Sequence, residues 1–447
     1  MKKLVVLGAG ESGVGAALLG KAKGWDVFVS DYGKIADKYK EVLLKNEILF
    51  EEAQHTWVNL KGANVVVKSP GIPDTAEVVM LLWKQNIPVI SEIEWAASFT
   101  KAKLIGITGS NGKTTTTSLV YHLLKSAGLN VGLAGNIGDS FAKQVVVDSF
   151  DYYVLEISSF QLDGVYETKF DIAVLLNITP DHLDRYNYDF KQYVASKFRI
   201  AKRSTKDSVF IYGGENEAIE ERLKTRPVLA RNHAFGLANN HVFSACLEGE
   251  KAVAKVDRNI IEVDLQDIPL KGKHNISNVL AALLVTCAIG IPEEKVIAGL
   301  KSFKGIEHRL EFVANKNGVE FINDSKATNV DAVWYALDAM EKPVVWIAGG
   351  VDKGNDYNEL LELVKNKVDG LVCLGKSNEK LINFFKPHIQ NIVEAESAEE
   401  AVEKAVKLAS DNSVVLLSPA CASFDLFKNY EDRGTKYKEA IYNITPK

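Results

Sequence analysis

Short apolar runs alternate with longer amphipathic segments along most of the chain, and this alternation is typical of α/β proteins with largely parallel sheets. In the amino-terminal part the pattern predicts helices at 14–23 and 77–85, and strands at 4–7, 26–30, 65–68 and 89–90. A new set of strands begins at residue 104 and continues at 152–157 and 172–177, followed by a helix at 190–201. This restart indicates a domain boundary near residues 92–100.

The second half of the chain returns to the same alternation after an irregular stretch. Charged, turn-rich sequence with short strands covers 205–267, and helices follow at 275–289 and up to residue 302. Beyond 303–305 the pattern predicts a third α/β unit, with helices at 331–340, 358–365 and 398–409 and strands at 319–323, 344–348, 371–374 and 414–417. A length of 447 residues agrees with three domains of ~150 residues each. We therefore predict domains at 1–95, 96–302 and 303–447.

The composition narrows the class of protein. Hydrophobic residues make up 47% and charged residues 25% of the chain, as in ordinary globular proteins. A net charge of −5 offers no basic field for nucleic acid or for an anionic membrane. The four cysteines form no CxxC pair, which suits a reducing compartment. The longest apolar helix candidate, 279–291, is shorter than the ~20 residues that a bilayer requires. We expect a soluble, cytoplasmic protein that binds neither nucleic acid nor membranes.

A glycine-rich turn joins the strand at 104–107 to a helix that begins with Lys113 and Thr114. Glycines let backbone N–H groups approach phosphates, and the amino terminus of the helix adds the positive end of its dipole. Lys113 would then reach the β- and γ-phosphates of ATP, and the Thr114 hydroxyl would bind Mg²⁺. The strict pattern G-x-x-x-x-G-K-[ST] is not met, because its first position is Ile107. We interpret the turn as an ATP-binding loop; the alternative is a glycine-rich turn without a ligand.

Two later strand ends have residues with metal-binding chemistry. Glu156 ends a strand beyond the ATP-binding loop, the usual place of a second Mg²⁺ ligand, although a simple turn glutamate is the alternative. His182 follows the next strand between two aspartates, and its position beside Glu156 favours a ligand over a structural histidine. Lys197 lies in a helix with several other cations, so its sequence context alone predicts a solvated lysine.

The amino-terminal turn Gly8-Ala9-Gly10-Glu11-Ser12-Gly13 is a full G-x-G-x-x-G motif between a strand and a helix, and Asp31 ends the next strand. This combination indicates a dinucleotide such as NAD, or another nucleotide diphosphate, because the turn recognises the pyrophosphate. The same sheet edge would present Ser69, Pro70 and Gly71. Since the chain also has an ATP-binding loop, ATP plus a nucleotide-linked substrate is the better interpretation.

Polar loops in the carboxyl-terminal part offer amide, cationic and hydroxyl donors. Asn275 and Asn278 lie one turn apart on a helix, where they would contact an adenine edge or cap the helix. Arg309 could supply a cation to the triphosphate. Three loops after parallel strands would form one rim of a crevice. Its cationic and hydroxyl donors, which suit a dicarboxylate ligand, would be Lys326, Thr328, Lys353 and Ser423. The alternative is a set of ordinary polar loops.

Together these motifs resemble those of the Mur ligase family, along the whole chain and in the same order. The resemblance lies in the segments 106–114, 156–162, 179–185, 272–278 and 323–329. The blocks Ser418-Pro-Ala-Cys-Ala-Ser-Phe-Asp and Phe427-Lys-Asn-Tyr-Glu-Asp-Arg-Gly are similar to those of the members that add D-glutamate. The resemblance implies a Rossmann-like first domain for a UDP moiety, a P-loop-type central domain for ATP, and a Rossmann-like third domain for D-glutamate.

The resemblance also implies roles for individual residues, with ATP and two Mg²⁺ ions as cofactors. Catalytic roles would fall to Lys113, His182 and Lys197, and a carbamylated Lys197 would join Thr114, Glu156 and His182 as metal ligands. ATP would be bound by Gly109, Asn111, Gly112, Lys113, Thr114, Thr115, Asn275, Asn278, Arg309 and Asp324. The UDP-linked substrate would contact Gly10, Ser12, Gly13, Asp31, Ser69, Pro70, Gly71, Asn136, Ser158 and His182. D-Glutamate would lie against Lys326, Thr328, Lys353, Ser423, Phe424 and Tyr430.

The reaction implied by the resemblance is ATP-dependent amide formation between UDP-N-acetylmuramoyl-L-alanine and D-glutamate, through an acyl phosphate, in peptidoglycan precursor synthesis. We expect a monomer. Two alternatives remain open. One is a ligase for another amino acid, such as L-alanine or meso-diaminopimelate, or a folylpolyglutamate synthetase; the Ser-Pro-Ala-Cys-Ala-Ser block at 418–423 argues against these. The other is an NAD-dependent oxidoreductase, which would leave Lys113, Glu156 and His182 without a role.

Overall fold

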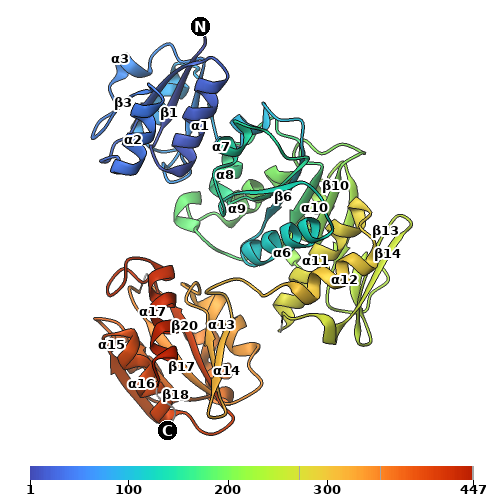
Figure 1. Cartoon of the computed structure of the whole chain (residues 1–447), viewed down its shortest axis with the longest axis vertical. Helices are drawn as coiled ribbons and strands as arrows, with labels where there is room; N and C mark the ends of the chain where they lie inside the picture. Colours follow the sequence, from blue (N-terminus) through green and yellow to red (C-terminus); the bar gives the residue numbers. More distant parts are fainter. Residues whose placement is uncertain (271, 353, 445–447) are drawn as a thin grey trace. The chain divides into compact units, whose positions relative to one another are not determined.

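The computed structural model describes residues 1–270, 272–352 and 354–444, and these residues form three sheets flanked by helices (Figure 1). The chain divides into two compact units. One unit contains Met1–Ile268 with Ile276–Phe303, and the other contains Pro269–Asn275 with Lys304–Lys447. The first unit therefore holds two of the three sheets.

The first sheet has five parallel strands in the order β3-β2-β1-β4-β5. These strands are β1 (Lys3–Leu7), β2 (Asp26–Ser30), β3 (Leu49–Glu51), β4 (Val65–Lys68) and β5 (Val89–Ile90). The helices that connect them are α1 (Glu11–Ala22), α2 (Asp37–Lys45), α3 (Trp57–Leu60) and α4 (Glu77–Lys84). The strand order reverses between β1 and β4, which is where doubly wound sheets bind their ligands. The predicted Rossmann-like first sheet is confirmed.

The second sheet has nine strands in the order β14-β13-β12-β11-β10-β9-β6-β8-β7. Its parallel part consists of β6 (Lys103–Thr108), β7 (Val131–Gly135), β8 (Tyr152–Glu156), β9 (Ile172–Leu175), β10 (Val209–Gly213) and β11 (Arg231–Phe235). The strands β12 (Ala245–Glu248), β13 (Lys251–Val256) and β14 (Asn259–Asp264) form an antiparallel extension. The associated helices are α6 (Lys113–Ser126), α7 (Phe141–Val145), α8 (Ser159–Asp163), α9 (Phe190–Lys197), α10 (Glu217–Thr225), α11 (Lys273–Ile289) and α12 (Glu293–Ser302).

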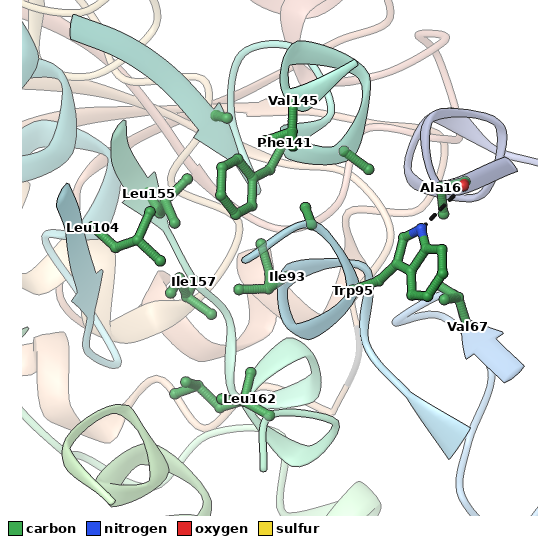
Figure 2. Close-up of a cluster of buried hydrophobic side chains, with 14 of the residues drawn as sticks. Ala16, Val67, Ile93, Trp95, Leu104, Phe141, Val145, Leu155, Ile157 and Leu162 are labelled. Atoms are coloured by element: carbon green, nitrogen blue, oxygen red, sulfur yellow. Dashed lines mark hydrogen bonds between the residues drawn. The ribbon is translucent and has the colours of Figure 1, made fainter. Parts of the chain in front are cut away.

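The first two sheets are joined by a shared apolar core around α5 (Glu92–Ala97), which is drawn in Figure 2. Trp95 points toward α1, where its indole Nε1 donates to the Ala16 carbonyl at 3.2 Å. Ile93 on the same helix points toward Phe141 and Leu155 of the second sheet's core. The predicted boundary between residues 95 and 96 falls inside this helix.

The third sheet has the order β15-β16-β20-β17-β18-β19, and only β15, at the edge, is antiparallel to its neighbour. Its strands are β15 (Glu311–Lys316), β16 (Val319–Asn323), β17 (Val344–Gly349), β18 (Val368–Leu374), β19 (Asn391–Ala395) and β20 (Val414–Ala420). One face packs against α13 (Val330–Asp338), α14 (Leu361–Lys367) and α15 (Glu379–Phe385). The other face packs against α16 (Ala398–Leu408) and α17 (Tyr430–Tyr442), which lie side by side (Figure 1).

Three further findings concern membrane-spanning helices, the cysteines and one helix boundary. No helix of the described residues combines the length and the apolar character that crossing a membrane requires. All four cysteines are buried and unbridged. The predicted helix at 358–365 is wrong in its start, because a 3₁₀ turn at Asn358–Leu360 precedes α14.

Candidate active site

The loop after β6 lies between the loops of two neighbouring parallel strands, since β6 pairs with β9 on one side and β8 on the other. Lys113 begins α6, and its Nζ donates to the carbonyls of Gly109 and Ser110 at 2.8 and 2.7 Å. Gly112 has a φ of +81°, and a Cβ there would lie 2.2 Å from Asn278 Oδ1, so this turn requires glycine. This strand–turn–helix geometry fits a phosphate-binding loop, with the Lys113 side chain folded onto the loop carbonyls.

Lys197 is the residue for which the prediction from sequence context alone is wrong. Its side chain is 1% exposed, and its Nζ donates to the same Gly109 carbonyl at 2.7 Å. Burial first, and the neighbouring Lys113 cation second, lower the pKa of Lys197 well below its usual value. The other cations in and just after α9 favoured a solvated side chain, but sequence does not show that the last turn of this helix points into the sheet edge. A lowered pKa raises the fraction of Lys197 that is present as the neutral, nucleophilic amine.

Glu156 ends β8 on the same edge of the sheet. Its Oε1 accepts from Asn136 Nδ2 at 2.7 Å, while Oε2 is buried without a hydrogen-bond partner in the described part of the chain. The backbone of Gly135, at φ +103°, passes so close that a Cβ would lie 2.2 Å from the Glu156 carbonyl oxygen. An unpartnered buried carboxylate oxygen is costly unless a cation binds it. The donor chemistry of Glu156 therefore fits Mg²⁺, which prefers oxygen ligands.

His182 follows β9 at a left-handed backbone position, with φ +52°. Its side chain is 54% exposed, and its ring contacts Phe160 edge-on at 5.1 Å between centroids. The loop after β9 is tied to the loop after β6, because Asn111 N donates to Asn177 Oδ1 at 2.9 Å and Ser110 Oγ donates to the Thr179 carbonyl at 2.9 Å. His182 is thus held at the same sheet edge as Lys113, with an exposed imidazole.

Residues predicted for the UDP-linked substrate lie at the carboxyl edge of the first sheet and at the adjoining edge of the second. The Asp31 carboxylate accepts from Ala9 N at 2.6 Å and from Gly33 N at 2.7 Å, so both of its oxygens hold backbone turns. Ser69 Oγ donates to the Gly8 carbonyl at 3.4 Å, which joins the loops after β1 and β4. In the second sheet Ser158 caps α8 in a capping box with Gln161.

The remaining residues of this set follow the same edges. Gly10 is the N-cap of α1, and its carbonyl accepts from Val14 N at 2.9 Å, while Ser12 and Gly13 lie in the first turn. The carbonyls of Pro70 and Gly71 accept from Arg185 at 3.3 and 3.5 Å. Arg185 follows His182 by three residues, and its guanidinium also lies over the Phe160 ring at 4.4 Å. The structure therefore connects the loop after β4 directly to the segment that contains His182.

The amides predicted for ATP lie in the first turns of α11. Asn278 is buried, and its Oδ1 accepts from Thr116 Oγ1 of α6 at 3.2 Å, so this side chain braces the loop after β6. Asn275 is also buried, and its backbone N donates to the Gly272 carbonyl at 3.0 Å. Thr114 and Thr115 are buried in the first turn of α6.

In the third sheet the three predicted loops follow one edge, because β16, β20 and β17 are adjacent and parallel. Arg433 of α17 is 1% exposed and donates to the carbonyls of Ser325, Cys421 and Gly349, one on each of the three loops, at 2.8, 3.2 and 3.4 Å. Its Nε also donates to Ser325 Oγ at 3.0 Å. One guanidinium therefore fixes the spacing of all three loops, a role that sequence inspection missed.

Asp324 is buried at the start of the loop after β16, where it accepts from Ser418 Oγ at 2.9 Å and from Leu310 N at 3.2 Å. Burial raises the pKa of Asp324 to about 7. These contacts tie the turn that contains Arg309 to the third sheet. Asp324 was predicted to bind ATP, and in this structure both of its oxygens accept hydrogen bonds from the chain itself.

The residues predicted for D-glutamate differ in exposure. Ser423 is buried, Thr328 is half-buried, and Phe424 is 71% exposed. The ammonium of Lys326 lies 5.1 Å from the centre of the Tyr430 ring, and the Tyr430 carbonyl accepts from Ser325 Oγ at 2.8 Å. Lys353 lies outside the described residues.

Comparison with known proteins identifies families and relatives that this chain resembles. The Mur ligase middle domain matches residues 107–286, the Mur ligase glutamate ligase domain matches 308–421, and the MurD N-terminal domain matches 3–78. Two relatives, from Christiangramia forsetii and Bacteroides fragilis, are each 50% identical to this chain over 443 and 445 residues, or 99% of this chain and 100% of each relative. Both are named UDP-N-acetylmuramoylalanine–D-glutamate ligase.

A solved structure, MurF ligase from Thermotoga maritima in complex with ADP, has a similar fold. Its TM-score is 0.61 at 15% sequence identity, over 95% of this chain and 97% of that one. At this identity the likeness concerns the fold alone.

Proposed function

This chain belongs to the Mur ligase family, and we infer that it catalyses the ATP-dependent addition of D-glutamate to UDP-N-acetylmuramoyl-L-alanine. It is an acid–D-amino-acid ligase of peptidoglycan precursor synthesis. The full-length identity of 50% to ligases of that name supports both substrates. We further propose that it works in the cytoplasm as a monomer.

The arrangement of two lysines on one carbonyl is the observation that best supports this function. Lys113 and Lys197 both donate to the Gly109 carbonyl, so two ammonium groups would repel each other there. A neutral Lys197 amine can react with carbon dioxide, and the resulting carbamate would replace that repulsion with attraction to Lys113. Its oxygens would add to the unpartnered Oε2 of Glu156 as ligands for Mg²⁺.

The proposed reaction has two steps. The alanine carboxylate of the substrate attacks the γ-phosphorus of ATP, which gives an acyl phosphate and ADP. The neutral amine of D-glutamate then attacks the acyl carbon, phosphate leaves with the former carboxylate oxygen, and the nitrogen loses a proton. Lys113 would hold the phosphates in line, and bound Mg²⁺ would supply neutralising charge to the transferred phosphoryl group.

We propose the following division of the site. Residues 1–95 hold the UDP-linked substrate through Gly10, Ser12, Gly13, Asp31, Ser69, Pro70 and Gly71. Residues 96–302 hold ATP through the loop 109–115, Asn275 and Asn278. The two Mg²⁺ ions have Thr114, Glu156, His182 and carbamylated Lys197 as ligands. Asn136 and Ser158 lie near the sugar of the UDP-linked substrate. Residues 303–447 hold D-glutamate through Lys326, Thr328, Lys353, Ser423, Phe424 and Tyr430. Arg309 and Asp324 of the same part of the chain would contribute to ATP binding.

The direct test is ADP release with UDP-N-acetylmuramoyl-L-alanine and each candidate amino acid in turn. D-Glutamate should give rapid ADP release, whereas L-alanine, meso-diaminopimelate and L-glutamate should give little above background. Preference for another amino acid, or equal ADP release without any amino acid, would contradict the proposal.

A further inference from the structure

A cluster of hydrogen-bonded side chains joins the three segments that contain Glu156, His182 and Lys197. The Tyr186 hydroxyl lies 2.9 Å from Asp163 Oδ2 and 3.2 Å from Ser196 Oγ. Tyr186 and Ser196 are buried, and Asp163 is partly buried. The reaction proposed above gives these three residues, which we call the Tyr186 cluster, no role.

Each member of the Tyr186 cluster belongs to one of the three segments. Asp163 is the last residue of α8, the helix that begins three residues after Glu156. Tyr186 ends the 3₁₀ turn Leu183–Tyr186, which directly follows His182. Ser196 precedes Lys197 in α9. The cluster is therefore where the three candidate ligand segments meet through polar side chains.

The hydrogen bonds of the cluster fix the position of α9 in particular. Ser196 Oγ donates to the Ser159 carbonyl at 3.0 Å, which fastens α9 to the first residue of α8. Burial raises the pKa of Asp163, and the Tyr186 hydroxyl donates to the Oδ2 of this carboxyl at 2.9 Å. Because an unsatisfied buried polar group is costly, the cluster strongly favours one arrangement of the three segments.

The Tyr186 ring adds packing to these polar contacts. It lies parallel to Phe160, at 6.3 Å between centroids, and edge-on to Tyr193, at 5.4 Å. Phe160 in turn contacts the His182 ring, and the Tyr193 hydroxyl lies 3.0 Å from Ser110 Oγ in the loop after β6. The ring and the hydroxyl of Tyr186 thus have separable functions, and a phenylalanine in its place would keep the first and lose the second.

We propose that the Tyr186 hydroxyl, with Asp163 and Ser196, is a positioning group that holds Glu156, His182 and Lys197 in register for one Mg²⁺ ion. The inference rests on the proposed function, because it assigns these residues a role toward the ion proposed there. A ligand set drawn from three separate segments is sensitive to small displacements of any one of them. Loss of a group that orients metal ligands typically weakens metal binding by about 10–100-fold.

The test compares Tyr186→Phe with the wild type and with Tyr153→Phe as a matched control. Tyr153 of β8 is another buried tyrosine, and its hydroxyl likewise lies near a carboxylate, 3.4 Å from Asp148 Oδ1. Two readouts need no turnover. One is binding of Mn²⁺, a stand-in for Mg²⁺ with the same oxygen preference, followed by electron paramagnetic resonance. The other is the carbamate signal of Lys197 in ¹³C NMR with labelled bicarbonate.

We expect Tyr186→Phe to weaken Mn²⁺ binding about tenfold or more and to reduce the carbamate signal, with a thermal midpoint close to that of Tyr153→Phe. Wild-type Mn²⁺ affinity in Tyr186→Phe would overturn the inference, and so would equal weakening in Tyr153→Phe, which would mark a general loss of stability. If Tyr186→Phe does not fold, Ser196→Ala must show the same weakening. Absence of both signals in the wild type would instead refute the proposed metal site, and this inference with it.

Discussion

Replacing Arg433 with methionine should separate D-glutamate binding from the other substrates. The guanidinium donates to one backbone carbonyl on each of three loops of the third sheet. Methionine fills similar space but donates nothing, so three buried carbonyls lose a partner. At about 1 kcal/mol or more for each unsatisfied group, the loss is about 3 kcal/mol. Part of it is offset, because burial lowers the pKa of Arg433 to about 10, which shows that the buried charge is itself costly.

We therefore expect a net destabilisation of roughly 2 kcal/mol and loops that no longer hold a common spacing. The Michaelis constant for D-glutamate should rise at least about tenfold, equivalent to about 1.4 kcal/mol of lost binding. The constant for UDP-N-acetylmuramoyl-L-alanine should stay within about twofold, because its proposed site lies in the other compact unit.

The assay is ADP release at saturating concentrations of the two fixed substrates, with the thermal midpoint measured on the same preparations. Arg199→Met is the matched control, since Arg199 also donates to two backbone carbonyls, those of Leu162 and Val165 at 2.8 and 3.0 Å, but in the first unit. A folded Arg433→Met variant with an unchanged constant for D-glutamate would refute the argument. So would an equal rise in Arg199→Met.

Three further outcomes are expected. Lys113→Ala should lose nearly all turnover at an unchanged thermal midpoint, measured by ADP release and calorimetry; wild-type turnover would refute the phosphate-binding role. Ser423→Ala should raise the Michaelis constant for D-glutamate and spare that for ATP, and D-glutamine should be a poor substrate, whereas the reverse split would place the amino acid elsewhere. Burial raises the pKa of Glu92 from 4.5 to about 7, so the folded chain holds a proton that the unfolded chain has lost, and stability falls as pH rises between these values. Glu92→Gln should therefore raise the thermal midpoint at pH 8 but not at pH 4, and an equal change at both would refute this pKa argument.

The strands that sequence predicted best are those rich in valine and other large apolar residues, such as 65–68 and 344–348. Strand β7 was not predicted, because its sequence Val-Gly-Leu-Ala-Gly has low strand propensity and is set by pairing with β8. The edge strands β15 and β19 were also not predicted, since polar residues flank their short apolar runs, and the final helix α17 was not predicted because its sequence is mostly polar.

For the candidate site, sequence inspection picked out residues that lie in contiguous motifs. It did not reveal the contacts of residues whose partners are distant in sequence. The loop 106–114 and the three loops of the third sheet follow from glycines and polar residues at strand ends. Arg433 lies in a predicted motif, yet only the fold brings its guanidinium under three loops that are about 10–110 residues away in sequence. The burial of Lys197 could not be predicted from sequence for the same reason, because it depends on which turn of its helix faces the sheet.

The most direct test of the account is the fate of the substrate's carboxylate oxygens during turnover. With UDP-N-acetylmuramoyl-L-alanine labelled by ¹⁸O in its alanine carboxylate, and with D-glutamate and ATP, the inorganic phosphate is isolated and analysed by mass spectrometry. Attack of the carboxylate on the γ-phosphorus predicts one ¹⁸O atom in each phosphate released and none in the nucleotide product. Unlabelled phosphate, or label recovered in AMP, would contradict the acyl-phosphate ligase mechanism proposed for this chain.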